Sequence, residues 1–314
     1  MAHLIHSFRR LTLVTGLVLA AFARSSAGAD LATAATAGER TPETIAADAS
    51  RAFSFETLDF PGSSSTILWG LDDFDDAAGQ YAVAGGTSHA MTYRHGKFKP
   101  LAPNKLGPGF SAAGGPNDLG TTYGGYTDAA GIQHGFVITD GRFETIDFRG
   151  HVNSNVDAVD VSGAVLGVYW DADGVYHGML TRHGNDVPFD VDGARDTYPL
   201  GMNSEGDSVG YWDTDGVTVH GYLRRANGQV SVLDVPAAAA TVAFAINDFG
   251  QVAGYFADAS GGLHGYVRTG EHIRQIDVPG GVATIVTSLN NWGSVAGEYF
   301  DASGVRHGFL ARLK

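Results

Sequence analysis

One short motif, a histidine followed by glycine or alanine, recurs six times along the chain. Its copies begin at His89, His134, His177, His220, His264 and His307, in steps of 45, 43, 43, 44 and 43 residues. A second marker, an asparagine or aspartate three positions before a glycine, follows nearly the same steps at Asp76, Asn117, Asp160, Asn203, Asn247 and Asn290. Units of this length cannot bury their own faces, so each must pack against its neighbours.

Each repeat resolves into four short β-strands. In the last repeat, residues 274–278, 283–289, 294–300 and 305–312 are rich in β-branched and aromatic residues, and Gly, Asn, Asp and Pro separate them. No segment of the repeats keeps a helical period. The sequence therefore predicts an all-β fold over residues 53–314, a six-bladed β-propeller of four-stranded antiparallel blades.

The spacing of histidines and aspartates predicts how the blades are fastened. In an antiparallel hairpin with a short turn, four histidines face an aspartate, in the pairs His134–Asp147, His177–Asp190, His220–Asp234 and His264–Asp277. The position opposite His89 is Ala102, so the first blade lacks the pair. A Ser or Thr follows each such aspartate seven residues later, which predicts a His, Asp and hydroxyl hydrogen-bond set in each blade.

His307 has no downstream partner, because the printed sequence ends at Lys314. The one unmatched aspartate of this type is Asp59, in a strand expected over residues 53–60. We therefore predict that residues 53–60 form the outer strand of the last blade, pair antiparallel with residues 305–312, and place Asp59 opposite His307. This pairing removes a free sheet edge and closes the ring.

The first 29 residues are typical of an export signal. Arg9 and Arg10 precede the apolar stretch 11–23, and Ala27-Gly28-Ala29 resembles a cleavage site. Residues 30–52 are rich in Ala and Thr and predict a flexible linker. We expect an exported protein that acts in the periplasm or outside the cell, and no membrane insertion of the mature chain, because the apolar stretch is too short to span a bilayer.

Charge and cysteine content exclude several functions. All 34 acidic residues lie after residue 29, whereas three of the 20 basic residues lie before it, so residues 30–314 carry a formal charge of −17. Such a charge repels nucleic acid and anionic membranes. The chain has no cysteine, which excludes thiol catalysis and thiolate metal sites.

The repeated polar residues are explained by structure. One histidine per blade would be spread around the ring and could not converge on a metal ion. The Asp-x-Asp/Ser-Gly segments that begin at Asp171, Asp213 and Asp301 fit tight turns, and calcium is the alternative ligand for them. We expect no other cofactor.

A ligand site needs residues that differ between blades. On the expected face of the Asp-turns and the blade connections, the third and fourth blades carry aromatic and basic residues that suit sugars or anionic polymers, namely Trp170, Trp212, Arg149, His151 and Arg195. No nucleophile elbow, phosphate loop or zinc-protease motif occurs, so no catalytic residue is assigned.

The segment Asn247-Asp248-Phe249-Gly250-Gln251-Val252-Ala253-Gly254-Tyr255, followed by His264-Gly265-Tyr266, resembles the bacterial HAF repeat family of probable extracellular repeat proteins. The resemblance covers residues 53–314 and departs in one respect, since five of the six repeats replace the family's alanine after histidine with glycine. It implies repeat architecture and export, and it implies no activity. We expect a binding or scaffold module for an extracellular polysaccharide, surface component or protein. The alternative is a propeller hydrolase or lyase that acts on an extracellular polymer.

Overall fold

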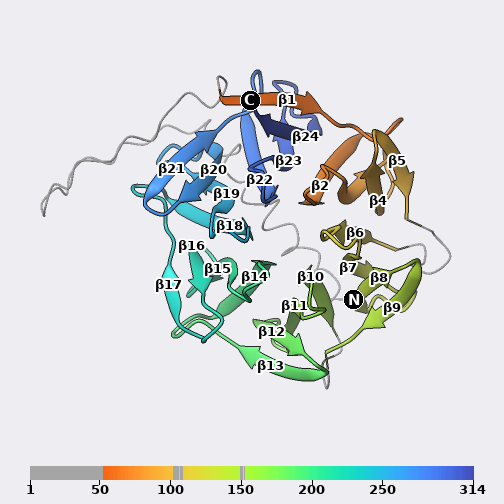
Figure 1. Ribbon diagram of the computed structural model, residues 1–314, viewed down its shortest axis with the longest axis vertical. Helices are drawn as coiled ribbons and strands as arrows, with labels where there is room; N and C mark the ends of the chain where they lie inside the picture. The colour runs from red at the N-terminus through yellow and green to blue at the C-terminus, as the bar shows by residue number, and fades with distance from the viewer. Residues whose placement is uncertain (1–51, 102–105, 107–108, 149–150, 152) are drawn as a thin grey trace, which may run out of the picture.

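The computed structural model describes residues 52–101, 106, 109–148, 151 and 153–314. These residues form six four-stranded antiparallel sheets arranged as blades around a central channel (Figure 1). The predicted six-bladed β-propeller is therefore confirmed. The expected export signal at residues 1–29 and almost all of the expected linker at residues 30–52 lie outside the described residues. No helix in the described ranges is long and apolar enough to cross a bilayer.

The strands of blades 1 to 5 run outward from the channel in chain order, and β1 is the outermost strand of blade 6. Blades 1 and 2 comprise β2 (Ser65–Leu71), β3 (Ala77–Ala82), β4 (Ser88–Arg94), β5 (Lys97–Pro100), β6 (Ser111–Gly114), β7 (Thr122–Thr127), β8 (Gln133–Thr139) and β9 (Arg142–Ile146). Blades 3 and 4 comprise β10 (Ser154–Val159), β11 (Val165–Trp170), β12 (Tyr176–Arg182), β13 (Asn185–Phe189), β14 (Asp196–Met202), β15 (Ser208–Asp213), β16 (Val219–Arg224) and β17 (Val230–Val232). Blades 5 and 6 comprise β18 (Ala240–Ile246), β19 (Val252–Ala257), β20 (Leu263–Thr269), β21 (His272–Ile276), β22 (Ala283–Leu289), β23 (Val295–Phe300), β24 (Arg306–Leu313) and β1 (Phe53–Thr57).

The first strand of the chain completes the last blade. β1 pairs antiparallel with β24, with Phe53 opposite Leu313 and Thr57 opposite Phe309 (Figure 1). Beyond the strand, the Leu58 amide donates to the Gly308 carbonyl at 2.9 Å, so the register continues toward Asp59. Phe53 and Leu58 are both buried. The predicted closure of the ring by the N-terminal strand is therefore present.

The blades pack closely where a glycine of one blade meets a side chain of the next. A Cβ atom added at Gly265 in β20 would lie 2.6 Å from the Val286 side chain of the next blade. Only glycine leaves room for that side chain, because a contact this short forces one of the two groups to move. This glycine therefore sets how closely blades 5 and 6 approach.

The innermost strands carry a bulge at the same place in five blades. The register of each inner strand shifts around one residue, and these residues are Trp69, Asp157, Leu200, Phe244 and Thr287. A bulge leaves one residue out of the ladder and re-aims its side chain. In blade 2, the equivalent position is Gly114, the last residue of β6. The bulges thus give the channel wall a set of side chains that the regular ladder would not present.

Candidate ligand-binding site in the central channel

Described residues line two cavities in the channel, one toward each face of the ring. The asparagine-turn face carries the turns between the first and second strands of each blade, and a cavity of about 140 Å³ lies there. The connection face carries the Asp-turns and the connections between blades, and a larger cavity of about 350 Å³ lies toward it. The five bulge residues line both cavities and therefore lie between them.

Aromatic rings form part of the wall of the larger cavity. Tyr198 of β14 stacks on Tyr211 of β15 with ring centroids 5.0 Å apart. Trp69 and Phe244 lie with centroids 6.0 Å apart. All four rings line the cavity. Rings of this kind supply flat apolar surface with polar edges, which suits the face of a sugar ring.

Asp157 is the single carboxyl among the bulge residues. Its Oδ1 accepts a hydrogen bond from Asn155 Nδ2 at 2.5 Å, and its buried Oδ2 has no partner. Burial raises the pKa of Asp157 to about 7, against the opposing effect of the Asn155 hydrogen bond. Near neutral pH, the unpaired oxygen of Asp157 can therefore donate a hydrogen bond when the carboxyl is protonated and accept one when it is ionised.

A second carboxyl, Glu298 of β23, lines the same cavity beside Arg306 of β24. The Arg306 Nε atom lies 2.9 Å from Glu298 Oε2, and its guanidinium also lies over the Phe300 ring. Burial raises the pKa of Glu298, and Arg306 acts in the opposite direction. This ion pair neutralises the arginine, so the described residues that line the cavity offer no free cation to an anionic ligand.

Amide side chains complete the polar wall of the larger cavity. The Trp69 Nε1 atom donates to Gln80 Oε1 at 3.2 Å, and Gln80 in turn lies 3.4 Å from the Ser88 hydroxyl. The neighbouring blade 2 contributes the small residues Ala112, Gly114, Gly124 and Gly125 to the wall. Phe110 and Gln133, from the same repeat, also line this part of the cavity.

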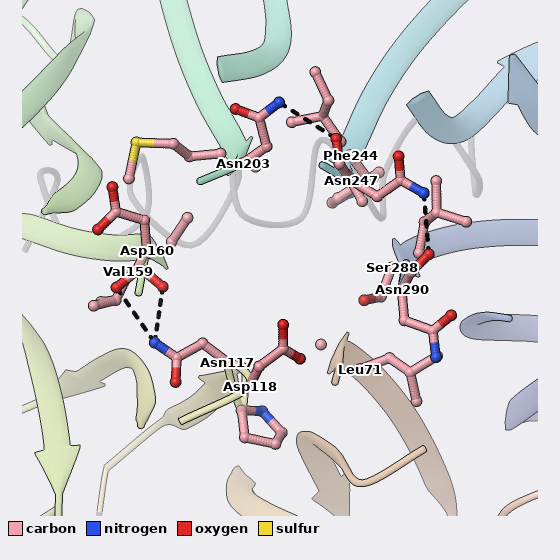
Figure 2. Close-up of a pocket in the computed structure, with 18 of the residues that line it drawn as sticks. Leu71, Asn117, Asp118, Val159, Asp160, Asn203, Phe244, Asn247, Ser288 and Asn290 are labelled. Carbon is pink, nitrogen blue, oxygen red and sulfur yellow. Dashed lines mark hydrogen bonds between the residues drawn. The ribbon is translucent and has the colours of Figure 1, made fainter. Parts of the chain in front are cut away.

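The smaller cavity is framed by side chains that link one blade to the next (Figure 2). The Asn203 amide donates to the Asn247 carbonyl at 3.3 Å, Asn247 to Asn290 at 3.1 Å, and Asn290 to the Asp72 carbonyl at 3.0 Å. Asn117 donates in the same way to Val159 and Asp160 of blade 3. Because an aspartate carboxylate cannot donate, the series is interrupted where Asp72 and Asp160 replace asparagine.

The structure corrects the second repeat marker in the first blade. Asp72, and not Asp76, occupies the asparagine position, because its Oδ1 accepts from the Phe74 and Asp76 amides as Asn117 does in blade 2. Asp76 instead accepts from the His95 amide of the outer hairpin. The sequence pattern failed here because Asp75, with φ 60°, takes the place of the turn glycine.

Four of the five residues proposed from sequence as ligand contacts lie among the described residues, and these four lie outside both cavities. Trp170 is 8% exposed and packs on Tyr176, so it offers no open platform. Trp212 and His151 each stack on a neighbouring ring, and Arg195 pairs with Asp196 at 3.0 Å. Arg149 lies outside the described residues. A binding role for these residues stays a prediction.

The predicted histidine and aspartate pairs are all brought together. The Nδ1 atoms lie 2.7–3.1 Å from the aspartate oxygens in His134–Asp147, His177–Asp190, His220–Asp234, His264–Asp277 and His307–Asp59. Each histidine ring also stands against the aromatic ring eight residues earlier, as Tyr126 does for His134 at 5.2 Å. The histidines therefore have structural partners on two sides.

The contact that the hydroxyls make in the structure differs from the one that the sequence predicted. The hydroxyls of Thr66, Thr197, Thr241 and Thr284 accept from the backbone amide that follows each aspartate, at 2.9–3.0 Å. They do not join the histidine and aspartate side chains, and each belongs to the inner strand of the next blade. The reason is geometric, because the chain must turn inward after the aspartate and the hydroxyl fixes that turn. The hydroxyl contact therefore links two neighbouring blades and does not lie within a single blade.

The Asp-turns use their carboxylates on their own backbone. Asp171 Oδ1 accepts from the Asp173 and Val175 amides, and Asp301 Oδ1 accepts from the Ser303 and Val305 amides, at 2.8–3.0 Å. In the Asp213 turn, Asp215 takes this role and accepts from Val217 and Thr218. No group of three or more His, Asp or Glu suited to a metal ion occurs among the described residues.

Sequence reasoning missed the bulge residues, although a signal was present. Trp69, Gly114, Asp157, Leu200, Phe244 and Thr287 each stand 20 positions before the repeat histidine. This register position holds six different residue types in six repeats. A position that never repeats within a repeating chain marks a surface on which the blades are free to differ.

No protein-family model and no curated protein matches the sequence. Among solved structures, the fold is similar to an asparagine-to-glutamine mutant of the Aleuria aurantia lectin in complex with Fucα1-6GlcNAc. The TM-score is 0.54 at 13% identity, over 82% of this chain and 93% of that chain. It is also similar to a mutant of AofleA from Arthrobotrys oligospora, with TM-score 0.53 at 14% identity over 82% and 86% of the two chains.

A third similar structure is TolB from Acinetobacter baumannii, with TM-score 0.50 at 12% identity over 76% of this chain and 66% of that chain. At identities this low, the three similarities concern the fold alone. They agree with the architecture described above, and another of the similar lectin structures is described as a six-bladed β-propeller.

Proposed function

We propose that this protein is a carbohydrate-binding propeller whose larger channel cavity takes a neutral sugar or the end of a neutral polysaccharide. The observation that carries the proposal is the lining of that cavity, where Trp69, Tyr198, Tyr211 and Phe244 face unrepeated polar side chains. A volume of about 350 Å³ falls in the usual range for small-ligand sites. The lectin function of similar propellers is compatible with this use of the fold.

The charge of the cavity selects for a neutral ligand. Arg306 is paired with Glu298, so an acidic sugar would find no free cation. Asp157 has one unpaired oxygen, and the Asn155 and Gln133 amides line the wall nearby. Hydroxyl groups can both donate to and accept from such partners, and a buried polar oxygen gains most from a ligand that satisfies it.

We further propose that the chain is an exported protein of the HAF repeat family, acting in the periplasm or outside the cell. The support comes from the sequence, in the arginine pair, apolar stretch and small-residue site of residues 1–29, and in the repeated motif of residues 247–266. A binding module at this location would meet polysaccharides of a cell surface. Mass measurement of the protein recovered from its own host tests the export, since a mature start near Asp30 is expected.

A panel of neutral mono- and oligosaccharides tests the sugar proposal on residues 30–314. We expect Ala112→Phe, which fills the larger cavity without deleting a contact, to weaken binding of any hit by about tenfold or more. Trp69→Ala should weaken it as well. The matched control is Trp212→Ala, which removes a tryptophan from the same fold away from the channel. If Trp212→Ala abolishes binding while Ala112→Phe leaves it unchanged, the channel is not the site.

A hydrolase or lyase is a second candidate function, and one observation favours it. Asp157 and Glu298, two carboxyls that no other blade repeats, line one concave site, and burial raises the pKa of both. A protonated carboxyl beside an ionised one is the arrangement that glycoside cleavage uses. Incubation with any sugar polymer that binds tests this directly. Product release that Asp157→Asn abolishes while binding persists would establish an enzyme, and unaltered polymer would exclude one for that substrate.

A further inference from the structure

The asparagine-turn face carries exposed apolar side chains where turns normally carry polar ones. The residue at the third position of the turn is 75–76% exposed at Phe74, Phe249 and Trp292, and 69% exposed at Leu119. We call these four residues the turn rim. They belong to blades 5, 6, 1 and 2, which are consecutive around the ring, and blades 3 and 4 carry Ser162 and Glu205 instead. The turn rim therefore covers one continuous arc of this face.

Carboxylates from three of these turns line the smaller cavity inside this arc. Asp118 Oδ1 accepts from the Asp73 amide at 3.0 Å, and Asn291 Nδ2 lies 3.1 Å from Asp73 Oδ2 and 3.3 Å from Asp248 Oδ2. We call Asp73, Asp118 and Asp248 the acid mouth. Three carboxylates from three blades are thus held in one linked group.

No positive side chain from the described part of the chain lines the smaller cavity beside the acid mouth. The described residues that line the smaller cavity include five aspartates and no Lys, Arg or His. Burial raises the pKa of Asp118, and the neighbouring charges of Asp73 and Asp248 raise it further. A cationic group placed at this mouth would relieve the repulsion among the three carboxylates.

We propose that the asparagine-turn face binds a segment of a partner protein that inserts a lysine or arginine into the acid mouth, with large apolar side chains resting on the turn rim. The two features are independent, because the rim comes from the third turn position and the acid mouth from the second. A polypeptide fits both, since it presents charged and apolar side chains at short intervals over several blades. An anionic membrane fits poorly, because the acid mouth repels it.

This site lies at the opposite end of the channel from the larger cavity. A sugar at the connection face and a protein segment at the asparagine-turn face would therefore not compete for the same surface. The protein would then join two different partners through one ring. This inference does not depend on the proposed sugar function, because none of the rim or acid-mouth residues lines the larger cavity.

The test uses a fluorescein-labelled peptide of alternating leucine and lysine, titrated against residues 30–314 and followed by fluorescence anisotropy. We expect binding that weakens at high salt, and that is lost when glutamate replaces lysine or serine replaces leucine in the peptide. The combined variant Asp73→Asn, Asp118→Asn and Asp248→Asn should weaken binding by about tenfold or more. The control Glu144→Gln, Asp173→Asn and Asp192→Asn changes net charge equally through exposed residues elsewhere and should bind as the parent protein does.

The apolar contribution is tested by Phe74→Ser, Phe249→Ser and Trp292→Ser, against Val217→Ser as the exposed apolar control. The first three should each weaken peptide binding severalfold, and the control should not. Absence of peptide binding, or equal binding by all variants, would overturn the proposal. A parent protein that dimerises, or that cosediments with neutral phosphatidylcholine vesicles, through contacts that Trp292→Ser removes would also overturn it in favour of a second copy or a membrane.

Discussion

The outer parts of the blades and the wall of the channel follow opposite rules. Toward the outside, five histidines repeat the same contacts, an aspartate at Nδ1 and an aromatic ring against the imidazole. In the channel, one register position carries six different residues in six blades. The repeated contacts hold the ring together, whereas the unrepeated side chains create cavities. Stability and ligand binding are therefore expected to respond to different substitutions.

The largest expected effect comes from deleting residues 53–60. Phe53 and Leu58 are buried, and their removal also exposes Phe309 and Leu310 of β24. Each large apolar side chain withdrawn from the core costs about 1.5–3 kcal/mol. We expect calorimetry of residues 61–314 to give a Tm several degrees or more below that of residues 30–314. Equal Tm values would show that the closing strand contributes nothing to the outer framework.

The next largest effect should be an increase in Tm, caused by a substitution at Asp157 in the channel. Burial raises the pKa of Asp157 from its ordinary value to about 7, so the folded protein holds this proton more tightly than the unfolded chain. The free energy of unfolding therefore falls as pH rises from about 4 to about 7 and stays low above that. Asp157→Asn should raise the Tm by a few degrees at pH 8 and leave it unchanged near pH 4.

Thermal scans of parent and variant over that pH range measure the effect. Asp147→Asn is the matched control. It makes the same carboxyl-to-amide change, but in the repeated His134–Asp147 pair toward the outside of blade 2. If Asp157→Asn destabilises the protein at pH 8, the channel carboxyl belongs to the framework and the contrast between the two regions fails.

A smaller, pH-dependent effect is expected at the closing pair. Partial burial acts to lower the pKa of His307, but the contacts with Asp59 and Asp301 raise it above its ordinary value. A histidine whose folded pKa is raised contributes stability that is complete below the unfolded pKa and is lost as pH rises through the folded one. The Tm difference between the parent and Asp59→Asn should therefore be largest near pH 6 and shrink as the pH rises through the raised pKa of His307. A difference that is constant with pH would contradict this.

The smallest effect is expected in the first blade. His89 lies 3.4 Å from the Thr87 hydroxyl and contacts no carboxylate among the described residues. His89→Gln should therefore change the free energy of unfolding by less than about 0.5 kcal/mol. His264→Gln, which removes a paired histidine, should cost about 1 kcal/mol. Urea denaturation of both variants measures the difference, and equal losses would mean that the aspartate contact adds nothing.

The sequence was sufficient to predict the six blades and the pairing that closes the ring. The period predicted the blades, and a constant residue offset predicted that Asp59 meets His307 across 248 positions of chain. The prediction of hydrogen-bond partners failed where the spacing was right but the contact was different. Thr284 accepts from the Val278 amide and does not join His264 and Asp277. The sequence pattern also failed at Asp72, since Asp75 replaced the expected glycine.

The channel site was beyond prediction for a related reason. Which face a strand residue occupies follows from alternation, but a bulge breaks alternation, and Trp69, Asp157 and Phe244 all lie at bulges. The sequence shows that these residues differ between repeats but not that they point into the channel. The repeat pattern instead predicted that the ligand-binding tryptophans lie beside the Asp-turns, where Trp170 is buried.

The pairing of β1 with β24 determines how the ring would respond to a pulling force. The two strands are antiparallel, and Phe53 lies beside Leu313 at one end of the pair, where the Lys314 amide also donates to the Ala52 carbonyl at 2.9 Å. A load applied between residues 52 and 314 therefore opens the strands like a zipper, one hydrogen bond at a time. A load applied along the long axis of the strands, at opposite ends of the pair, would instead have to break all of these bonds together. The same joint that closes the ring thermodynamically is thus its mechanically weak point.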